Sequence, residues 1–373
     1  MVEAERRYGL VREAAERERV DAVIAAGSEY TGFEGAVRYL SGFDIVHRYA
    51  HVLLPHGEEP SIVFPAEARF VGEHARSWIA DQVFADTPGE WLRKRCEERG
   101  WRRVGVYGLD YVLNVRDFRA LSAGSLELVG FDTAFDAARA VKSEEELDSV
   151  RESVRINEAG MWETIRAYEP GRTEAEIMAP ASARFVELGC GRHAMNMVLS
   201  GTGGEANPEF KIPSETRPVE PDDLLLYSLE IAGPGGHWVE VSRPLIAGEP
   251  SDLTKQMMEA YEEYYETAQR TLVEGATAED VHRAVAPIFR DRGWQLGHVT
   301  GHSIGMTMIE HPRIGEGSRV ELRENMVLSM HPHVLSDDAT SCLYMQDTYR
   351  VGRDCGEPLA TIPLRIYRGG ETA

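Results

Sequence analysis

The residues best suited to chemistry are histidines carried on short, partly apolar segments in the second half of the chain. His298 and His302 lie together in one segment rich in glycine, and His331 follows a later apolar run. Imidazole can transfer protons or bind a metal ion, so these segments are candidates for a catalytic site. The four cysteines show no CxxC spacing, which indicates free thiols in a reducing compartment rather than a zinc knuckle or a disulfide framework.

Length and composition indicate the class of protein. A chain of 373 residues predicts two domains, and its hydrophobic fraction of 43% and charged fraction of 27% are typical of globular proteins. The formal net charge of −22 argues against binding to nucleic acid or anionic lipid, because the field of the protein repels phosphate. No stretch approaches the ~20 apolar residues of a membrane span, and the N-terminus has no apolar signal-peptide core. We therefore expect a cytoplasmic protein without nucleic-acid or membrane partners.

The first part of the chain alternates between helical and strand patterns. A helical pattern over residues 3–19 is followed by a short apolar run over 20–26, which predicts a buried strand. Further strands are predicted at 49–54, 61–64 and 103–107, and further helices at 66–78 and 89–99. This alternation predicts an α/β domain over residues 1–140.

A second domain is predicted over residues 141–373. Ser143, with glutamate three positions later, forms a capping box that starts a long helix, and Thr173 with Glu176 starts the next one. The later patterns predict strands at 195–200, 224–231, 238–246, 326–330, 342–351 and 362–367, and helices at 253–273 and 278–292.

Blocks of the second domain resemble the creatinase/prolidase/aminopeptidase P family, peptidase family M24. They are Ser200-Gly201 leading to Asn207-Pro208, Asp223-Leu224-Leu225-Leu226 running to Glu240-Val241-Ser242-Arg243, His298 to Gly305, and Asn325 to Pro332 followed by Gln346-Asp347-Thr348. The resemblance implies an α/β (α+β) protein with an N-terminal creatinase-like domain and a C-terminal pita-bread domain, in which a curved antiparallel sheet is backed by two helix pairs. It also implies a homodimer.

The resemblance implies a site that departs from the ordinary metal centre of the family. Metal-dependent members hold two ions with two aspartates, one histidine and two glutamates. The first aspartate position falls near Ser228 and Leu229, with Glu230 as the nearest carboxylate. The other matching positions are Glu240, His302, His331 and Gln346. Neutral imidazole and amide groups cannot bridge two ions as carboxylates do, so we expect no two-metal centre.

Three interpretations of this site remain open. Glu240, His302 and His331, with Gln346 or His333 as a further ligand, form a good set for one Fe, Mn or Zn ion. Without metal, His302 or His331 acts as the general acid or base and Glu240 orients the substrate, as resemblance to the metal-free creatinase branch implies. In the third interpretation the cavity only binds a molecule.

The function expected from these interpretations is hydrolysis of a C–N bond in a small nitrogenous substrate. The catalytic residues would be Glu240, His302 and His331, and the resemblance suggests His298, His311 and Glu230 as substrate contacts. The alternatives are a lyase or oxygenase with one metal ion and a catalytically inactive binding protein.

Overall fold

The computed structural model describes residues 2–30, 32–70, 77–190 and 193–372. Contacts between Cα atoms divide the chain into two compact units. The first consists of Met1–Ala140 with Met306–Met308, and the second of Val141–Gly305 with Ile309–Ala373. None of the described helices is long and apolar enough to cross a membrane.

The first unit is built on a six-stranded mixed sheet with the order β4-β3-β2-β1-β5-β6. Its strands are β1 (Ala22–Ser28), β2 (Tyr49–Pro55), β3 (Ser61–Pro65), β4 (Asp81–Ala85), β5 (Arg103–Tyr107) and β6 (Glu127–Gly130). Alternate residues of β1 enter two different core clusters, Val23 and Ala25 one of them and Ile24 the other. Since successive strand residues point to opposite faces, this sheet is covered on both faces.

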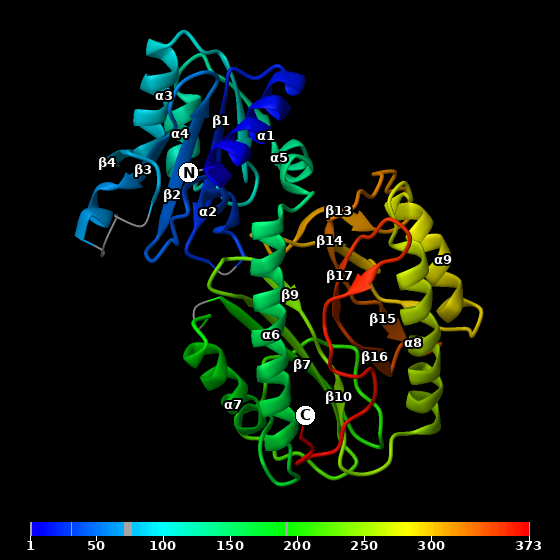
Figure 1. Ribbon diagram of the computed structural model, residues 1–373. Coiled ribbons are helices and arrows are strands. Elements are labelled where there is room, and N and C mark those ends of the chain that lie inside the picture. The colour runs from blue at the N-terminus through cyan, green and yellow to red at the C-terminus, as the bar shows by residue number, and fades with distance from the viewer. Residues whose placement is uncertain (1, 31, 71–76, 191–192, 373) are drawn as a thin grey trace. The chain divides into compact units, whose positions relative to one another are not determined.

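Helices supply those covers (Figure 1). They are α1 (Val2–Glu18), α2 (Gly35–Ser41), α3 (Pro88–Glu98), α4 (Val115–Ser122) and α5 (Asp132–Arg139). The helix predicted over residues 66–78 is wrong at both ends: Ala66–Phe70 is a 3-10 helix, and residues 71–76 lie outside the described residues. Trp78 is not helical, and its indole nitrogen donates a hydrogen bond to the Leu40 carbonyl oxygen at 2.7 Å.

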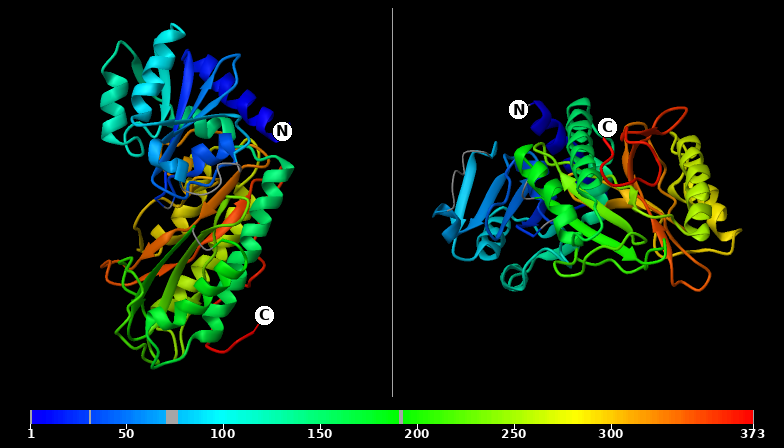
Figure 2. Two further views of the ribbon diagram at one scale, coloured as in Figure 1. Left: turned by 90° about the vertical axis from the view of Figure 1, so that its left-hand side faces the viewer. Right: turned by 90° about the horizontal axis from the view of Figure 1, so that it is seen from below.

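The second unit places antiparallel sheets between two helix pairs, as Figures 1 and 2 show. One pair is α6 (Glu144–Ala167) with α7 (Glu174–Glu187), and the other is α8 (Asp252–Thr271) with α9 (Ala278–Arg290). The capping boxes predicted at Ser143 and Thr173 are both present. Each satisfies backbone N–H groups at a helix start that the helix itself leaves unpaired.

The described strands of this unit form three sheets. They are β7 (Ala194–Gly201), β8 (Leu224–Ala232), β9 (Trp238–Glu240) and β10 (Pro244–Leu245) in the first; β11 (Gln295–Leu296), β15 (His333–Leu335) and β16 (Cys342–Tyr344) in the second; and β12 (Gly301–Ser303), β13 (Glu310–Ile314), β14 (Val327–Met330), β17 (Asp347–Arg350) and β18 (Glu357–Pro358) in the third. In the third sheet β12 pairs with both β13 and β14, which fixes the register of the histidine segment.

Three strand predictions in this unit need correction. The run 238–246 is divided into β9 and β10, and the run 342–351 into β16 and β17. Residues 362–367 form no strand. There the carbonyl oxygens of Ile362 and Pro363 accept hydrogen bonds from the buried guanidinium of Arg243, so they are not available to a sheet.

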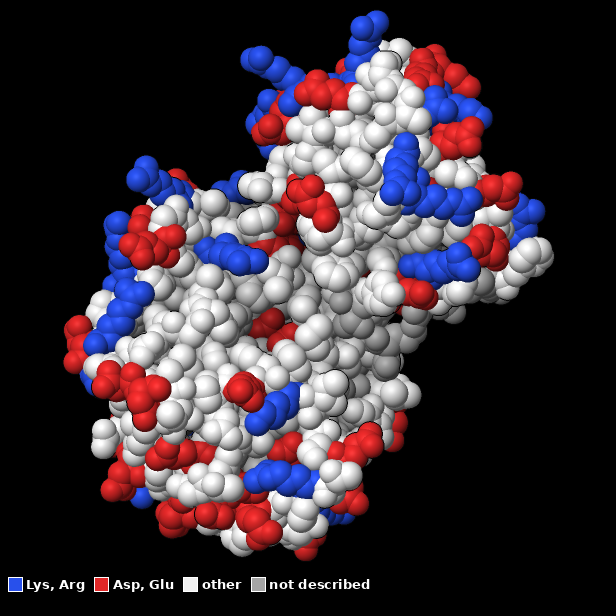
Figure 3. Space-filling view, turned by 180° about the vertical axis from the view of Figure 1, so that it is seen from behind, with Lys and Arg blue, Asp and Glu red and all other residues white. Residues whose placement is uncertain are grey.

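Charged side chains of both signs are interspersed on the face in Figure 3, where Lys and Arg lie among Asp and Glu. Over the whole sequence the acidic residues predominate, with 62 Asp and Glu against 40 Lys and Arg. The formal net charge of the whole chain is therefore −22.

Candidate active site

Three polar residues meet where strands of the second unit end or pair. Glu240 is the last residue of β9, His302 is the middle residue of β12, and His331 directly follows β14. Because β12 pairs with β14 in antiparallel register, His302 lies opposite Ser329, two residues before His331. All three side chains are buried, and a ligand atom from each lies within 4.8 Å of the others. The structure therefore brings together the three residues expected to be catalytic.

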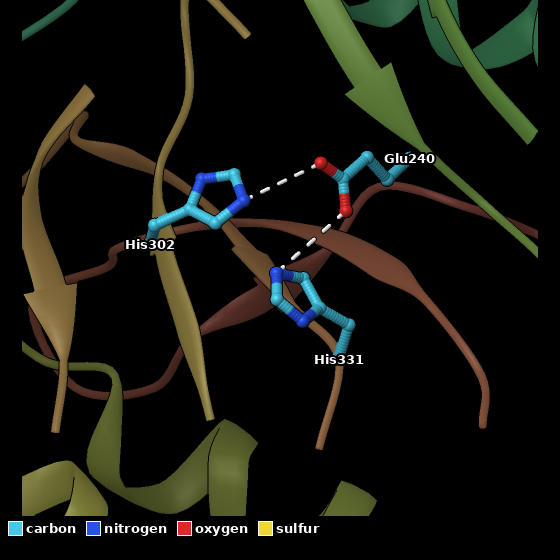
Figure 4. A group of neighbouring side chains, drawn as sticks. All are labelled: Glu240, His302 and His331. Carbon is cyan, nitrogen blue, oxygen red and sulfur yellow. Dashed lines mark ion pairs between the residues drawn. The ribbon is translucent and has the colours of Figure 1, made fainter. Parts of the chain in front are cut away.

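The two imidazoles point at different oxygens of one carboxylate (Figure 4). The Nε2 atom of His302 is 3.5 Å from Oε1 of Glu240, and Nε2 of His331 is 3.8 Å from Oε2. The Nδ1 atom of His302 is 2.9 Å from the carbonyl oxygen of Ser303 and donates to it, since that oxygen can only accept. This bond orients the ring so that Nε2 faces Glu240.

An amide links Glu240 to a second buried carboxyl group. Nε2 of Gln346 donates hydrogen bonds to Oε1 of Glu230 at 3.0 Å and to Oε2 of Glu240 at 2.9 Å. The hydroxyl of Ser228 donates to Oε1 of Glu230 at 2.7 Å, and that of Ser329 to Oε2 of Glu240 at 2.6 Å. Glu230 and Gln346 thus border the group of three, while the amide nitrogen of Gln346 faces the carboxyl groups.

Burial and charge set different protonation states for these groups. Burial and the Glu240 charge raise the pKa of Glu230 to about 7. Burial alone would also raise the pKa of Glu240, but the charges of His331 and His302 and the bonds from His302 and Ser329 outweigh it and lower that pKa to about 2. Burial lowers the pKa of His331 to about 3. Near neutral pH, Glu240 is therefore ionised and His331 is neutral.

His302 behaves differently from His331, although both are buried. Burial tends to lower its pKa, but the hydrogen bond to Glu240 and the Glu240 charge outweigh burial and raise it. The ionised Glu240 therefore favours a proton on His302, whereas burial favours the neutral imidazole at His331.

The rings of His298 and Tyr344 lie beside His331, and the rings of Phe210 and His333 pack against those two; we call these four the ring cluster. The ring of His298 is centred 5.2 Å from that of His331, and the ring of Tyr344 is centred 6.0 Å from it. The ring of Phe210 packs against the other three rings, and its centre lies 6.2 Å from the ring centre of His298, 5.3 Å from that of His333 and 5.0 Å from that of Tyr344. His298, suggested by the sequence as a substrate contact, is thus close to the group of three.

The remaining suggested contact, His311, lies elsewhere. It is on β13 with an exposed side chain, whereas its neighbours in sequence, Glu310 and Pro312, are buried. It is not part of the group formed by Glu240, His302 and His331.

Sequence reasoning missed three residues that border the site, Ser329, Tyr344 and Phe210. Ser329 and Tyr344 each precede a site residue by two positions, and alternation along a strand could have marked them as neighbours of His331 and Gln346. Phe210 carries no such signal, because it belongs to a loop between β7 and β8.

The donor set fits a divalent ion. A carboxylate and two neutral imidazole nitrogens are ligands that Zn, Fe and Mn accept in proteins. The hydrogen bond that fixes the ring of His302 is the kind of outer contact that orients metal-binding histidines. Gln346 could contribute only through Oε1, because its amide nitrogen carries hydrogens that point at the two carboxyl groups.

Comparisons with known proteins identify the family. The sequence pattern of metallopeptidase family M24 matches residues 148–353, more than half of the chain. The Xaa-Pro dipeptidase of Pyrococcus furiosus is 22% identical over 62% of this chain and 66% of its own length. The Xaa-Pro dipeptidase of Pyrococcus horikoshii is 23% identical over 52% of this chain and 56% of its own length. For the Xaa-Pro dipeptidase of Lactobacillus delbrueckii subsp. lactis the values are 25% over 82% of this chain and 85% of its own length.

Solved structures agree over almost the whole chain. A recombinant prolidase from Thermococcus sibiricus superposes with a TM-score of 0.83 at 19% identity, covering 99% of both chains. An Xaa-Pro dipeptidase from Bacillus anthracis gives a TM-score of 0.82 at 18% identity over 98% of this chain and 99% of its own. These likenesses confirm the expected fold, a creatinase-like α/β domain followed by a pita-bread domain. The chain belongs to metallopeptidase family M24.

Proposed function

We propose that this chain is a hydrolase that cleaves a C–N bond in a small substrate, at a centre made of Glu240, His302 and His331 with one divalent metal ion. The observation that carries the proposal is the convergence of these three ligand atoms within 4.8 Å, in a buried part of the second unit. Membership of a metallopeptidase family and relatives described as Xaa-Pro dipeptidases support hydrolysis as the reaction type.

The proposed ion would be held by one oxygen of Glu240 and by Nε2 of both histidines. When bound, it supplies Lewis acidity, which lowers the pKa of a coordinated water and polarises a carbonyl group. The chain's own contribution is to hold the ligands in place. Ser329 and Gln346 bond to Oε2 of Glu240, which leaves Oε1 on the side of His302.

We further propose that the centre takes one ion rather than two. A second ion would need anionic oxygens beside Glu240, and the nearest carboxyl group is Glu230. Oε1 of Glu230 already accepts hydrogen bonds from Ser228 and Gln346, and burial favours its neutral form. Turnover of Xaa-Pro dipeptides at the rates of two-metal enzymes is therefore not expected.

A second candidate is hydrolysis without metal, and the contact between His302 and Glu240 favours it. The hydrogen bond to Glu240 and the Glu240 charge raise the pKa of His302, which favours the protonated ring as the donor to a leaving nitrogen while Glu240 stabilises its charge. The two candidates share their residues, and they differ in whether a chelator abolishes turnover.

The experiment is a hydrolysis screen of purified protein against dipeptides, N-acyl amino acids and small amides, before and after treatment with a chelator. The proposal predicts activity that a chelator removes and that one divalent metal restores. His331→Ala should remove activity, whereas His51→Ala, a buried histidine beside Asp117 in the first unit, should preserve it in folded protein. Activity that survives complete metal removal would favour the second candidate. Absence of hydrolysis across the screen, with metal present, would contradict both.

The homodimer expected from the family resemblance also remains a proposal. Light scattering of the purified chain would test it, since a mass near twice the 41.6 kDa of one chain is expected.

A further inference from the structure

Three buried polar atoms near the site lack a hydrogen-bond partner among the residues that the structure describes. They are Nδ1 of His331, Nε2 of His333 and Oε1 of Gln346. All three residues are buried, with 5% of His331, 5% of His333 and none of Gln346 exposed. A buried polar group left unpaired is destabilising, and three of them near one site call for an explanation.

The three atoms belong to the group of three, to its border and to the ring cluster. Gln346 bonds to Glu240 through its nitrogen, so its oxygen is the atom left over. His331 presents Nε2 to Glu240 and turns Nδ1 away from it (Figure 4). His333 belongs to the ring cluster, where its ring is centred 5.3 Å from both His298 and Phe210.

The ring cluster offers flat, uncharged surfaces on the way from solvent to these atoms. Phe210 is 36% exposed, while Tyr344 is 3% exposed, so the cluster extends from the surface inward. The loop that carries Phe210 is held at two points, by a bridge from Ala206 to Cys342 and by another from Lys211 to Val198. The backbone on both sides of Phe210 is therefore held in place.

The chemistry of these surfaces selects a kind of ligand. Ring faces and edges favour a flat partner. The oxygen of Gln346 can only accept a hydrogen bond, whereas the two imidazole nitrogens donate or accept according to tautomer. A group with both N–H donors and a carbonyl acceptor offers a partner for each kind of atom, whereas a carboxylate has no hydrogen to give to Gln346.

We propose that the ring cluster and the three unpaired atoms form a binding subsite for a flat, uncharged group bearing an amide. Phe210, His298 and Tyr344 contact the flat group, and His331, His333 and Gln346 bond to the amide. This inference rests on the proposed function in so far as it describes that enzyme's substrate, and it makes Phe210 a residue that determines specificity.

Binding of three isosteric probes tests the proposal without requiring turnover. Benzamide is uncharged and carries an amide, benzoate is an anion without N–H groups, and benzamidine is a cation. Calorimetric titration should show benzamide binding most tightly. Equal or tighter binding of benzoate or benzamidine, or no binding of benzamide, would overturn the proposed class.

Variants locate the subsite. Phe210→Ala should weaken benzamide binding about two- to tenfold, the range that one aromatic contact provides. Ile212→Ala is the matched control, because Ile212 lies in the same loop with 86% of its surface exposed, and it should leave binding unchanged. His333→Phe keeps a ring but removes the nitrogen, and it should weaken benzamide by about two- to tenfold.

The outcomes separate this proposal from the proposed function. Unchanged benzamide affinity in Phe210→Ala would overturn the subsite even if the protein hydrolyses C–N bonds. Conversely, the expected probe order with no hydrolysis in the screen would leave the subsite in place and contradict the hydrolase.

Discussion

Replacing Glu230 by glutamine should make the metal-free protein more stable at alkaline pH. The carboxyl group of Glu230 is buried, and its pKa rises from 4.5 to about 7 in the folded chain. An acid with a raised folded pKa loses its proton more readily when unfolded, so folding stability falls as pH rises from about 4.5 to about 7. Glutamine cannot ionise, and its oxygen can still accept the bonds from Ser228 and Gln346.

The magnitude follows from the difference between the two pKa values. At about 1.4 kcal/mol per pKa unit, the step from 4.5 to about 7 corresponds to about 3 kcal/mol of unfolding free energy. The unfolding free energy of Glu230→Gln should therefore exceed that of the native chain by up to about 3 kcal/mol at about pH 8.5. The two should match at about pH 4, where the Glu230 carboxyl group is mostly protonated in both the folded and the unfolded chain.

The assay is urea unfolding of both proteins, dialysed against a chelator, at several pH values. The pH dependence of the difference in unfolding free energy identifies its cause, because only titration of Glu230 makes the variant more stable at alkaline pH alone. Equal stability at about pH 8.5 would refute the assigned pKa. A gain of the same size at about pH 4 would show that packing, rather than charge, separates the two proteins.

Three further predictions concern stability. The pKa of Glu240 is lowered to about 2, so the stability that its ionised form contributes is present above about pH 4.5 and should be lost as pH falls towards 2, which acid titration of unfolding would detect. Asp347→Ala should lower the unfolding free energy measured in urea by about 3–5 kcal/mol, because the fully buried Arg243 loses its counter-charge. Glu152→Ala, in an exposed ion pair, is the control and should change that free energy little. Ser143→Ala should cost about 1 kcal/mol through loss of the helix cap, and no change would contradict the role of the capping box.

Local signals in the sequence predicted many of the elements that hold the site. The capping boxes at Ser143 and Thr173 marked two helix starts, because the bonds involved join residues three positions apart. The apolar run before Ala232 predicted β8, which is buried along its whole length. The sequence does not predict short elements such as α2 and β9 as separate elements, because a few residues carry too little hydrophobic periodicity.

The site depends on contacts that local patterns do not contain. Glu240 and His302 lie on two different strands and His331 directly follows a third, and in the sequence only the family resemblance groups them. The link through Gln346 to Glu230 and the contact of Phe210 with His298 depend on side-chain directions across different sheets and loops. The strand wrongly predicted at residues 362–367 has the same origin, because Arg243, distant in sequence, binds the carbonyl oxygens of Ile362 and Pro363.

The number of metal ions per chain tests the central claim most directly. Elemental analysis of purified protein, after incubation with excess Zn, Mn or Fe and removal of free metal, should give one tightly held ion per chain. His331→Ala and Glu240→Gln, if folded, should retain none, because each removes one of the three ligands. Two ions per native chain, or retention of the ion in both variants, would contradict the single-ion centre, and no ion in the native chain would contradict the metal altogether.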